Sequence, residues 1–410
     1  MLDAGSGRAA RPMRGSFLSK RCSLPRQPQR LRHTVKNEIL FLGLDVHAQS
    51  ISVAVAENSG QREVRAYGNI PNCLHALERT MGKLKRAHPG RRLSVAYEAG
   101  PTGFVIARRL AQLKVECTVA APSRIPKASG ERVKTDRRDA LKLARLHRAG
   151  ELTAVHVPDA TDEAMRDLAR ARTDAVQDQR RARAQLKGFL LRHGYRYQGK
   201  SAWTAAHQRY LRELVLEHAA MRVVLEDSLR AISLAGERIA RLTEQMETLL
   251  ASWRLKPVVE ALMGLRGFQL VGAMVLASEL GEAWRFTHPR QLMGFLGLVP
   301  SEASSGERRR QGGITKTGNA HARWLLVEAA HHYRLSPKVS KELSKRQEHL
   351  SDAIKACSWK AQTRLHKRLM RLRARGKQVN KVTVAVAREL CGFVWQIFQL
   401  ARPARPAPKG

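Results

Sequence analysis

Apolar positions between residues 37 and 158 alternate as in a sheet and then repeat as in helices. The run EILFLGLDV (38–46) and the alternating segment ISVAVAE (51–57) predict two strands joined by a short turn, and EVRAYGNI (63–70) predicts a third. Spacings of three and four, broken by short apolar runs, predict helix 72–88, strand 92–99, helix 103–113, strand 114–122 and helix 135–150. Asn72 is the expected N-cap of the first of these helices, and Gly150 the expected end of the last.

The stretch from 159 to 255 is charged, poor in Gly and Pro, and predicted to be helical. Its apolar positions follow heptad spacing at Ile232, Ala235, Ile239, Leu242, Met246 and Leu249. A weaker version begins at Leu168, Ala171 and Ala175. The pattern predicts either an antiparallel helix pair within the chain or a dimerising coiled coil, and it does not choose between them.

Gly and Pro return in the third stretch, from 256 to 335. The segment ALMGLRGFQLVGAMVLASELG (261–281) predicts two helices with a turn at Gly267, a helix-hairpin-helix-like arrangement that can present backbone N–H groups to phosphates. A basic, Gly-rich loop is expected next, leading into a helix near 320–333. The remainder, 336–410, is expected to be helical, with WKAQTRLHKRLMRLRARGK (359–377) laying a basic stripe along one helix.

These patterns predict an α/β plus α organisation with five parts. Residues 1–36 are expected to be a disordered basic arm, or the product of a start codon placed upstream of Met13. Antiparallel strands followed by alternating β and α elements match an RNase H-like sheet over 37–158. A helical coiled-coil region over 159–255, a helical domain over 256–335 and a basic helical extension over 336–410 complete the expected order.

The charge of the chain points to a polyanionic partner. The 410 residues include 74 Lys and Arg against 35 Asp and Glu, a formal net charge of +39. Such a chain is expected to bind nucleic acid through phosphate contacts, with an anionic membrane surface or a ribosome-like role as alternatives. No apolar run approaches the about 20 residues that a membrane-spanning helix needs. The five cysteines form no CxxC pair, which argues against a zinc site and fits free thiols in a reducing cytoplasm.

Four acids stand out against this basic background. Asp45 and Glu98 each close an apolar strand, and Asp136 and Asp139 lie three apart at a helix start. Taken singly, each acid is more simply a turn residue or a first-turn acid favoured by the helix dipole. Together, four converging carboxylates would repel one another unless a cation neutralises them. The set therefore predicts a Mg²⁺ site, and two such ions can clamp the oxygens of a phosphodiester.

A second candidate lies in the Gly-rich loop. Ser304 and Ser305 precede Gly306 and three arginines, so a serine hydroxyl could attack a phosphate whose charge the arginines stabilise; these are Arg308, Arg309 and Arg310. The simpler interpretation is a flexible loop that binds phosphate without covalent chemistry. Further along, nucleic-acid contacts are expected from Lys316, Asn319 and Arg323, although any surface loop can carry such residues.

Several segments together resemble the DEDD-type transposases of the insertion-sequence one-ten family. They are the motifs LGLDVHAQSISVAV, YEAGPTGF and KTDRRDALKLARL, the block RFTHPRQLMGFLGLVPSEASSGERRRQGGITKTGNAHARWLLVEAAHHYR, and the late WKAQTRLHKR and VAVARELCGFVWQI. The resemblance runs from Ile39 to about Phe398, and the serine-containing block is its most specific part. It implies a RuvC-like domain, a coiled-coil linker and a C-terminal transposase domain.

The same resemblance implies roles for individual residues and partners. Asp45, Glu98, Asp136 and Asp139 would bind Mg²⁺, as two ions that Mn²⁺ could replace, and Ser305, with Ser304 in reserve, would form a transient phosphoserine link to DNA. The acids and the serine would act together across subunits of a homodimer or homotetramer. The implied partners are double-stranded DNA and a structured guide RNA encoded by the element, in the bacterial cytoplasm.

Two other classes of function remain open on the sequence. A RuvC-like nuclease or resolvase would hydrolyse DNA with water and leave no protein–DNA adduct. A non-catalytic nucleic-acid-binding scaffold would bind equally well in EDTA and would tolerate loss of the four acids.

Overall fold

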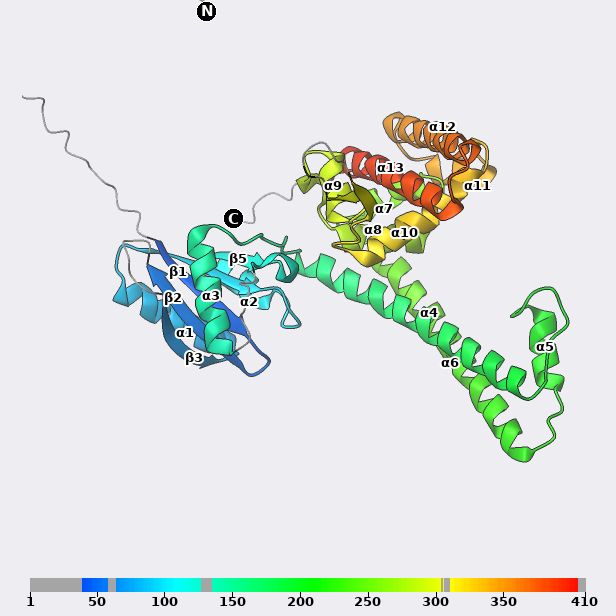
Figure 1. Cartoon of the computed structure of the whole chain (residues 1–410), viewed down its shortest axis with the longest axis horizontal. Coiled ribbons are helices and arrows are strands. Elements are labelled where there is room, and N and C mark those ends of the chain that lie inside the picture. The colour runs from blue at the N-terminus through cyan, green and yellow to red at the C-terminus, as the bar shows by residue number, and fades with distance from the viewer. Residues whose placement is uncertain (1–38, 58–63, 127–134, 304, 306–309, 405–410) are drawn as a thin grey trace, which may run out of the picture. The chain divides into compact units, whose positions relative to one another are not determined.

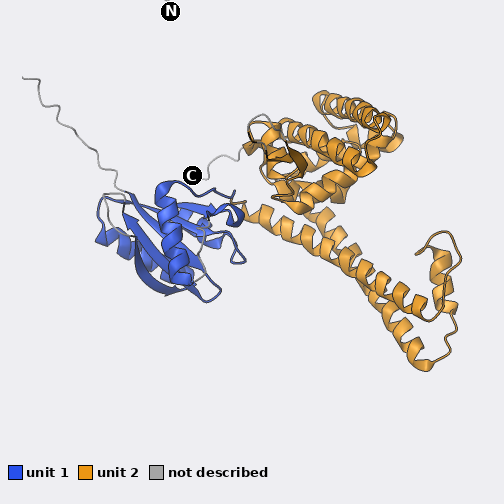
Figure 2. Cartoon of the chain, viewed as in Figure 1, with its two compact units in different colours: residues 1–156 blue, residues 157–410 orange. Residues whose placement is uncertain are grey.

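The computed structural model describes residues 39–57, 64–126, 135–303, 305 and 310–404 (Figure 1). The predicted basic arm and the residues Ser304, Gly306, Arg308 and Arg309 lie outside this description. The chain divides into two compact units at residue 156 (Figure 2), and each unit is considered by itself. No helix in the described ranges has both the length and the apolar composition needed to cross a membrane.

The first unit is built on a five-stranded mixed sheet. Its strands are β1 (Ile39–Val46), β2 (Ser50–Glu57), β3 (Arg65–Pro71), β4 (Arg92–Glu98) and β5 (Glu116–Ala120), and they lie in the order β3-β2-β1-β4-β5. β1, β2 and β3 pair antiparallel, whereas β4 pairs parallel with both β1 and β5. This confirms the predicted RNase H-like sheet.

Side-chain alternation divides β1 between the two faces of the sheet. Leu40, Leu42 and Leu44 are fully buried on one face, on the side of α1 (Leu74–Ala87) and α2 (Val105–Gln112). Phe41 and Gly43 point to the other face, which α3 (Asp136–Ala149) covers with its small side chains. The alternation matters for function because Asp45 continues the face that α3 covers.

The start of α1 differs from the prediction. Its N-cap is Cys73, whose Sγ accepts from the backbone N–H of Ala76, and not Asn72. The Asn72 side chain instead donates to the carbonyl of His47, which lies in the turn between β1 and β2, at 2.6 Å. A local capping rule could not anticipate this, because the competing acceptor is 25 residues away in the chain.

The second unit begins with a long antiparallel helix pair. It consists of α4 (Ala160–Arg192) and α6 (Ala219–Leu250), with the short α5 (Ala205–Glu213) at the end where the chain turns (Figure 1). Arg172 donates to Thr243 Oγ1 at 2.7 Å and Gln179 to the Ile232 carbonyl at 3.3 Å, so the partners run in opposite directions. Of the two arrangements left open by the heptads, the structure shows the pair within one chain.

The heptad pattern fails at its last position. Leu249 is 44% exposed, and Leu250 is buried in its place. A helix has 3.6 residues per turn, so a stripe of strict heptad spacing drifts around its surface over several turns.

The rest of the second unit packs around a continuous apolar core. Its helices are α7 (Lys256–Met263), α8 (Leu270–Leu280), α9 (Pro289–Phe295), α10 (Ala320–Ala330), α11 (Lys341–Gln347), α12 (Asp352–Ala374) and α13 (Val379–Leu400). The predicted turn between α7 and α8 is present. Gly267 has φ +95° there, and a Cβ would stand 2.7 Å from the Ala329 carbonyl oxygen, so both backbone conformation and space require glycine.

The region predicted as a Gly-rich loop contains two short strands. β6 (Pro300–Glu302) pairs antiparallel with β7 (Gln311–Ile314), so Ser305 lies between the two strands of a β-hairpin. β7 includes two consecutive glycines, a composition that disfavours strands, and the sequence therefore gave no strand signal.

Candidate active site

The carboxyl ends of β1 and β4 bring Asp45 and Glu98 to the same edge of the sheet. The two strands are parallel and Leu44 pairs with Tyr97, so Asp45 and Glu98 follow at adjacent positions. Alternation places both acids on the face that α3 covers. The strand register therefore brings these two of the four predicted acids to neighbouring positions.

α3 begins at this edge and carries the other two acids. Thr135 is its N-cap and accepts from the backbone N–H of Arg138, which fixes the first turn where Asp136 and Asp139 lie. The helix approaches β1 closely, because a Cβ on Gly43 would stand 2.2 Å from the Ala140 carbonyl oxygen. Glycine at this position therefore allows the first turn of α3 to reach Asp45.

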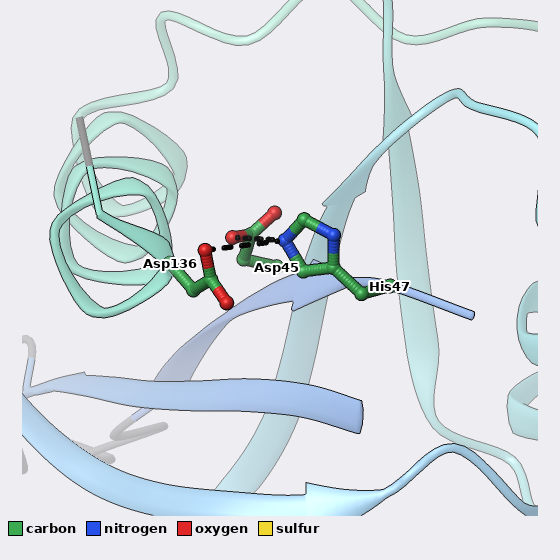
Figure 3. Close-up of side chains that lie close together, drawn as sticks. All are labelled: Asp45, His47 and Asp136. Carbon is green, nitrogen blue, oxygen red and sulfur yellow. Dashed lines mark hydrogen bonds and ion pairs between the residues drawn. The ribbon is translucent and has the colours of Figure 1, made fainter. Parts of the chain in front are cut away.

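A histidine completes the cluster (Figure 3). His47 Nε2 lies 3.1 Å from Asp45 Oδ2 and 3.4 Å from Asp136 Oδ1. Potential ligand atoms of these three residues all lie within 4.8 Å of one another. His47 was not among the site residues predicted from the sequence. The signal was the spacing in Asp-Val-His, because residues i and i+2 of an extended strand point to the same side.

The surroundings of Asp45 raise the pKa of its carboxyl group. Burial raises the pKa of its carboxyl group, and the nearby charges of Asp139 and Asp136 raise it further, while the hydrogen bond from His47 opposes the rise. A divalent cation would remove the cost of holding these acids together.

The four predicted acids are not equally close. Asp45 and Asp136 belong to the cluster with His47, and the half-buried Asp139 lies near enough to raise the pKa of Asp45. Glu98 is exposed at the end of the adjacent strand and lies outside the three-residue cluster. Carboxylate oxygens with one imidazole suit Mg²⁺ and Mn²⁺, so the residues present fit a divalent metal.

Ser305 lies in the second unit, apart in sequence from the acids. It is exposed, in the connection between β6 and β7, where the Ala303 backbone N–H donates to the Arg310 carbonyl at 3.0 Å. Arg310 is exposed as well. An exposed hydroxyl on a hairpin is accessible to a large substrate such as a nucleic-acid backbone.

The three residues predicted to contact nucleic acid beyond the hairpin have different surroundings. Lys316 is exposed. Asn319 caps α10 through its side-chain oxygen and donates from Nδ2 to Glu279 at 2.6 Å. Arg323 donates from Nη1 to the carbonyls of Leu296 and Thr317, each at 2.8 Å. The side chains of Asn319 and Arg323 therefore hold the loop before α10 in place.

Glu279 is a buried carboxylate that was not predicted from the sequence. Its side chain on α8 is fully buried and receives Arg170 Nε at 2.8 Å and Nη2 at 2.9 Å from α4, as well as Asn319. His321 Nδ1 lies 3.2 Å from Oε1. Nothing in the run LASELG distinguishes this acid from a surface residue, because its partners come from 109 residues before it and about 40 after it.

Comparison with known proteins identifies the family. Two family models match: a DEDD transposase family of the IS110 group over residues 42–194, and the family described as "Transposase IS116/IS110/IS902 family" over residues 259–345. The putative transposase y4qE of Sinorhizobium fredii is 45% identical over 368 residues, covering 88% of this chain and 89% of that protein. The transposase for insertion sequence element IS1533 of Leptospira borgpetersenii is 27% identical over 345 residues, covering 83% and 99%. The acidic edge of an RNase H-like sheet and these matches together show that the chain belongs to the IS110 family of transposases, with a DEDD catalytic domain at its N-terminal end.

Proposed function

We propose that this transposase cuts and rejoins DNA strands through a covalent serine intermediate, with Mg²⁺ bound by Asp45, Glu98, Asp136 and Asp139 and with Ser305 as the nucleophile. The observation that carries the proposal is the meeting of Asp45, His47 and Asp136 at the sheet edge, beside Asp139. Divalent cations held there would stabilise the negative charge that develops on phosphate oxygens.

The chemistry assigned to Ser305 is a transesterification. Its Oγ forms a bond to phosphorus as the bond from phosphorus to one deoxyribose oxygen breaks, and the serine proton passes to that leaving oxygen. The reverse step, with a different DNA strand end attacking the phosphoserine, rejoins the backbone. One phosphodiester bond replaces another throughout, so the exchange needs no external energy source.

The charge of the chain supports several nucleic-acid partners. A net charge of +39 suits a protein that holds two DNA duplexes, and we propose that a guide RNA encoded by the element selects them. Since the acids and Ser305 lie in different units of the chain, a homodimer or homotetramer could join the acids of one subunit with the serine of another.

Trapping the covalent intermediate tests the proposal. The protein, expressed from its intact element and supplied with a nicked element-end duplex, is expected to form a DNA adduct that survives denaturation and maps to Ser305 by mass spectrometry. Ser305→Ala should abolish the adduct, Ser304→Ala should retain it, and EDTA should prevent it. An adduct that persists in Ser305→Ala would refute the nucleophile assignment.

A nuclease that uses water is the second candidate, because Asp45, His47 and Asp136 form their cluster without any contribution from the serine hairpin. In that case DNA would be cut with free ends and no adduct, Ser305→Ala would cut normally, and Asp45→Asn would abolish cutting. The two candidates therefore differ in the response of one variant.

A further inference from the structure

The turning end of the α4–α6 hairpin contains a cavity, distant in sequence from both the acids and Ser305. Its volume is about 480 Å³, and it lies between the last turns of α4, the connecting segment 193–204 and α5. Pockets for small organic ligands have volumes of about 300–1,000 Å³, so the space is sufficient for one nucleotide.

Aromatic rings dominate the wall of this cavity. Three of the six tyrosines in the chain line it, together with a tryptophan: Tyr195, Tyr197, Tyr210 and Trp203. The Tyr197 ring lies 5.2 Å from that of Tyr210 and 4.7 Å from that of His207. A second hollow of about 560 Å³ shares Tyr197 and Tyr210, so both rings face open space as well as each other.

Trp203 is held in an unfavourable backbone conformation. Its φ is +67°, which is uncommon for a bulky residue. His207 Nδ1 accepts its backbone N–H at 3.1 Å, and the Arg183 guanidinium lies 4.7 Å from its ring centroid. Strained conformations that the surroundings enforce concentrate at functional sites. The structure thus maintains this indole at the cavity wall.

The charged residues that line the cavity are all basic. Lys187, Arg196 and Lys200 lie around the rings, and none of the described lining residues is acidic. All three are exposed, whereas the rings are half-buried. Planar rings inside with cations at the rim match a nucleotide, whose base stacks and whose phosphate carries the charge.

We propose that this cavity binds an unpaired nucleotide of a single-stranded nucleic acid, with the base stacked against Tyr197 and Tyr210 and the phosphate near Lys187 and Lys200. Stacking on the neighbouring base pairs covers both faces of a base within a duplex, so the cavity selects single-stranded segments such as loops. The proposal does not depend on the metal-binding acids or on the serine nucleophile.

If the aromatic rings served only to stabilise the fold, they would be buried away from solvent. The apolar contacts that fasten this end of the hairpin are provided by Leu186, Phe189, Leu211 and Leu216, all buried. Tyr195, Trp203 and Tyr210 pack against that core but are only partly buried, and Tyr197 is partly buried as well. Removing one ring should therefore affect ligand binding more than folding.

Photocrosslinking locates the site directly. A short single-stranded oligonucleotide carrying one 5-iodouridine is mixed with the full-length protein at high salt, which suppresses non-specific phosphate contacts. We expect crosslinked peptides from residues 195–210. An oligonucleotide with an abasic position beside the probe should crosslink less. Crosslinking yields of RNA and DNA oligonucleotides are compared in parallel to identify which kind of strand the cavity binds. A higher yield at residues 195–210 with either one supports the site.

Affinity measurements with matched variants complete the test. Tyr197→Leu and Tyr210→Leu should raise the Kd for the single strand by roughly 5- to 100-fold, the effect of losing one stacked ring. Tyr197→Phe should bind normally, as should Tyr67→Leu, which removes an exposed ring in β3. Lys200→Gln should weaken binding more than Lys345→Gln, an exposed lysine on α11. Unchanged affinity in Tyr197→Leu and Lys200→Gln, or crosslinks that map elsewhere, would overturn the proposal.

Discussion

Gly43 of β1 and Ala140 of α3 touch so closely that a methyl group on Gly43 would stand 2.2 Å from the Ala140 carbonyl oxygen and 2.4 Å from the Ala144 nitrogen. Both obstructing atoms belong to helix backbone, which cannot rotate away as a side chain can. The contact therefore sets the distance between the strand that carries Asp45 and the helix that carries Asp136.

Gly43→Ala should move α3 and weaken metal binding. Inserting a methyl group into a closed contact costs about 1–3 kcal/mol of unfolding free energy, and the shift would separate Asp136 from Asp45. Chemical denaturation and Mn²⁺ titration measure the two effects. Gly82→Ala in α1 is the matched control, because the nearest atom there is 3.8 Å away and alanine favours helices. Normal Mn²⁺ affinity in Gly43→Ala would show that the contact does not position the acids.

His47 is predicted to be a metal ligand or a close supporting contact of the metal. Bound Mn²⁺ should show nitrogen coupling in pulsed electron paramagnetic resonance if His47 Nε2 coordinates it, and His47→Gln should remove that coupling. If His47 only orients Asp45 and Asp136, the coupling will be absent and His47→Gln should still lower metal affinity by roughly 10- to 100-fold. His88→Gln, on a residue outside the cluster, provides the control.

Glu279→Gln should destabilise the second unit. The substitution removes a buried charge that receives two hydrogen bonds from Arg170 and one from Asn319. Hydrogen bonds to charged groups contribute about 1.5–3 kcal/mol each in favourable cases, so a loss of at least that size is expected in urea unfolding. Glu260→Gln removes only a helical pair with Lys256 at 3.8 Å and should change stability by less than about 0.5 kcal/mol.

Low pH should lower the unfolding free energy of the second unit through the same residue, Glu279. Burial raises the pKa of Glu279, but hydrogen bonds from His321, Arg170 and Asn319 outweigh it and hold the pKa well below its usual 4.5. A carboxyl whose folded pKa is depressed contributes stability that is complete above 4.5 and is lost as the pH falls towards the folded value. Unfolding free energy measured from neutral pH to about pH 3 should therefore fall more steeply in the wild type than in Glu279→Gln. Equal slopes would contradict this role.

The sequence indicated most of the helices and strands because their signals are local. The buried run ending at Asp45, the Thr135 cap and the Gly150 stop each depend on a few neighbouring residues. Predictions failed where a distant partner intervened. Asn72 does not cap α1, because its side chain donates to the His47 carbonyl instead. Gln311–Ile314 forms a strand despite its two glycines, because it pairs with β6.

The sequence alone determined which residues could form the acidic site and that the chain would bind a polyanion, since residue type and charge are independent of folding. Only the tertiary structure decided that Asp45, Asp136 and His47 meet, that Glu98 lies apart from that cluster, and that Glu279 is buried. The physical reason is that strand register and helix approach set distances between side chains, and both depend on contacts between residues far apart in the chain, such as Gly43 with Ala140.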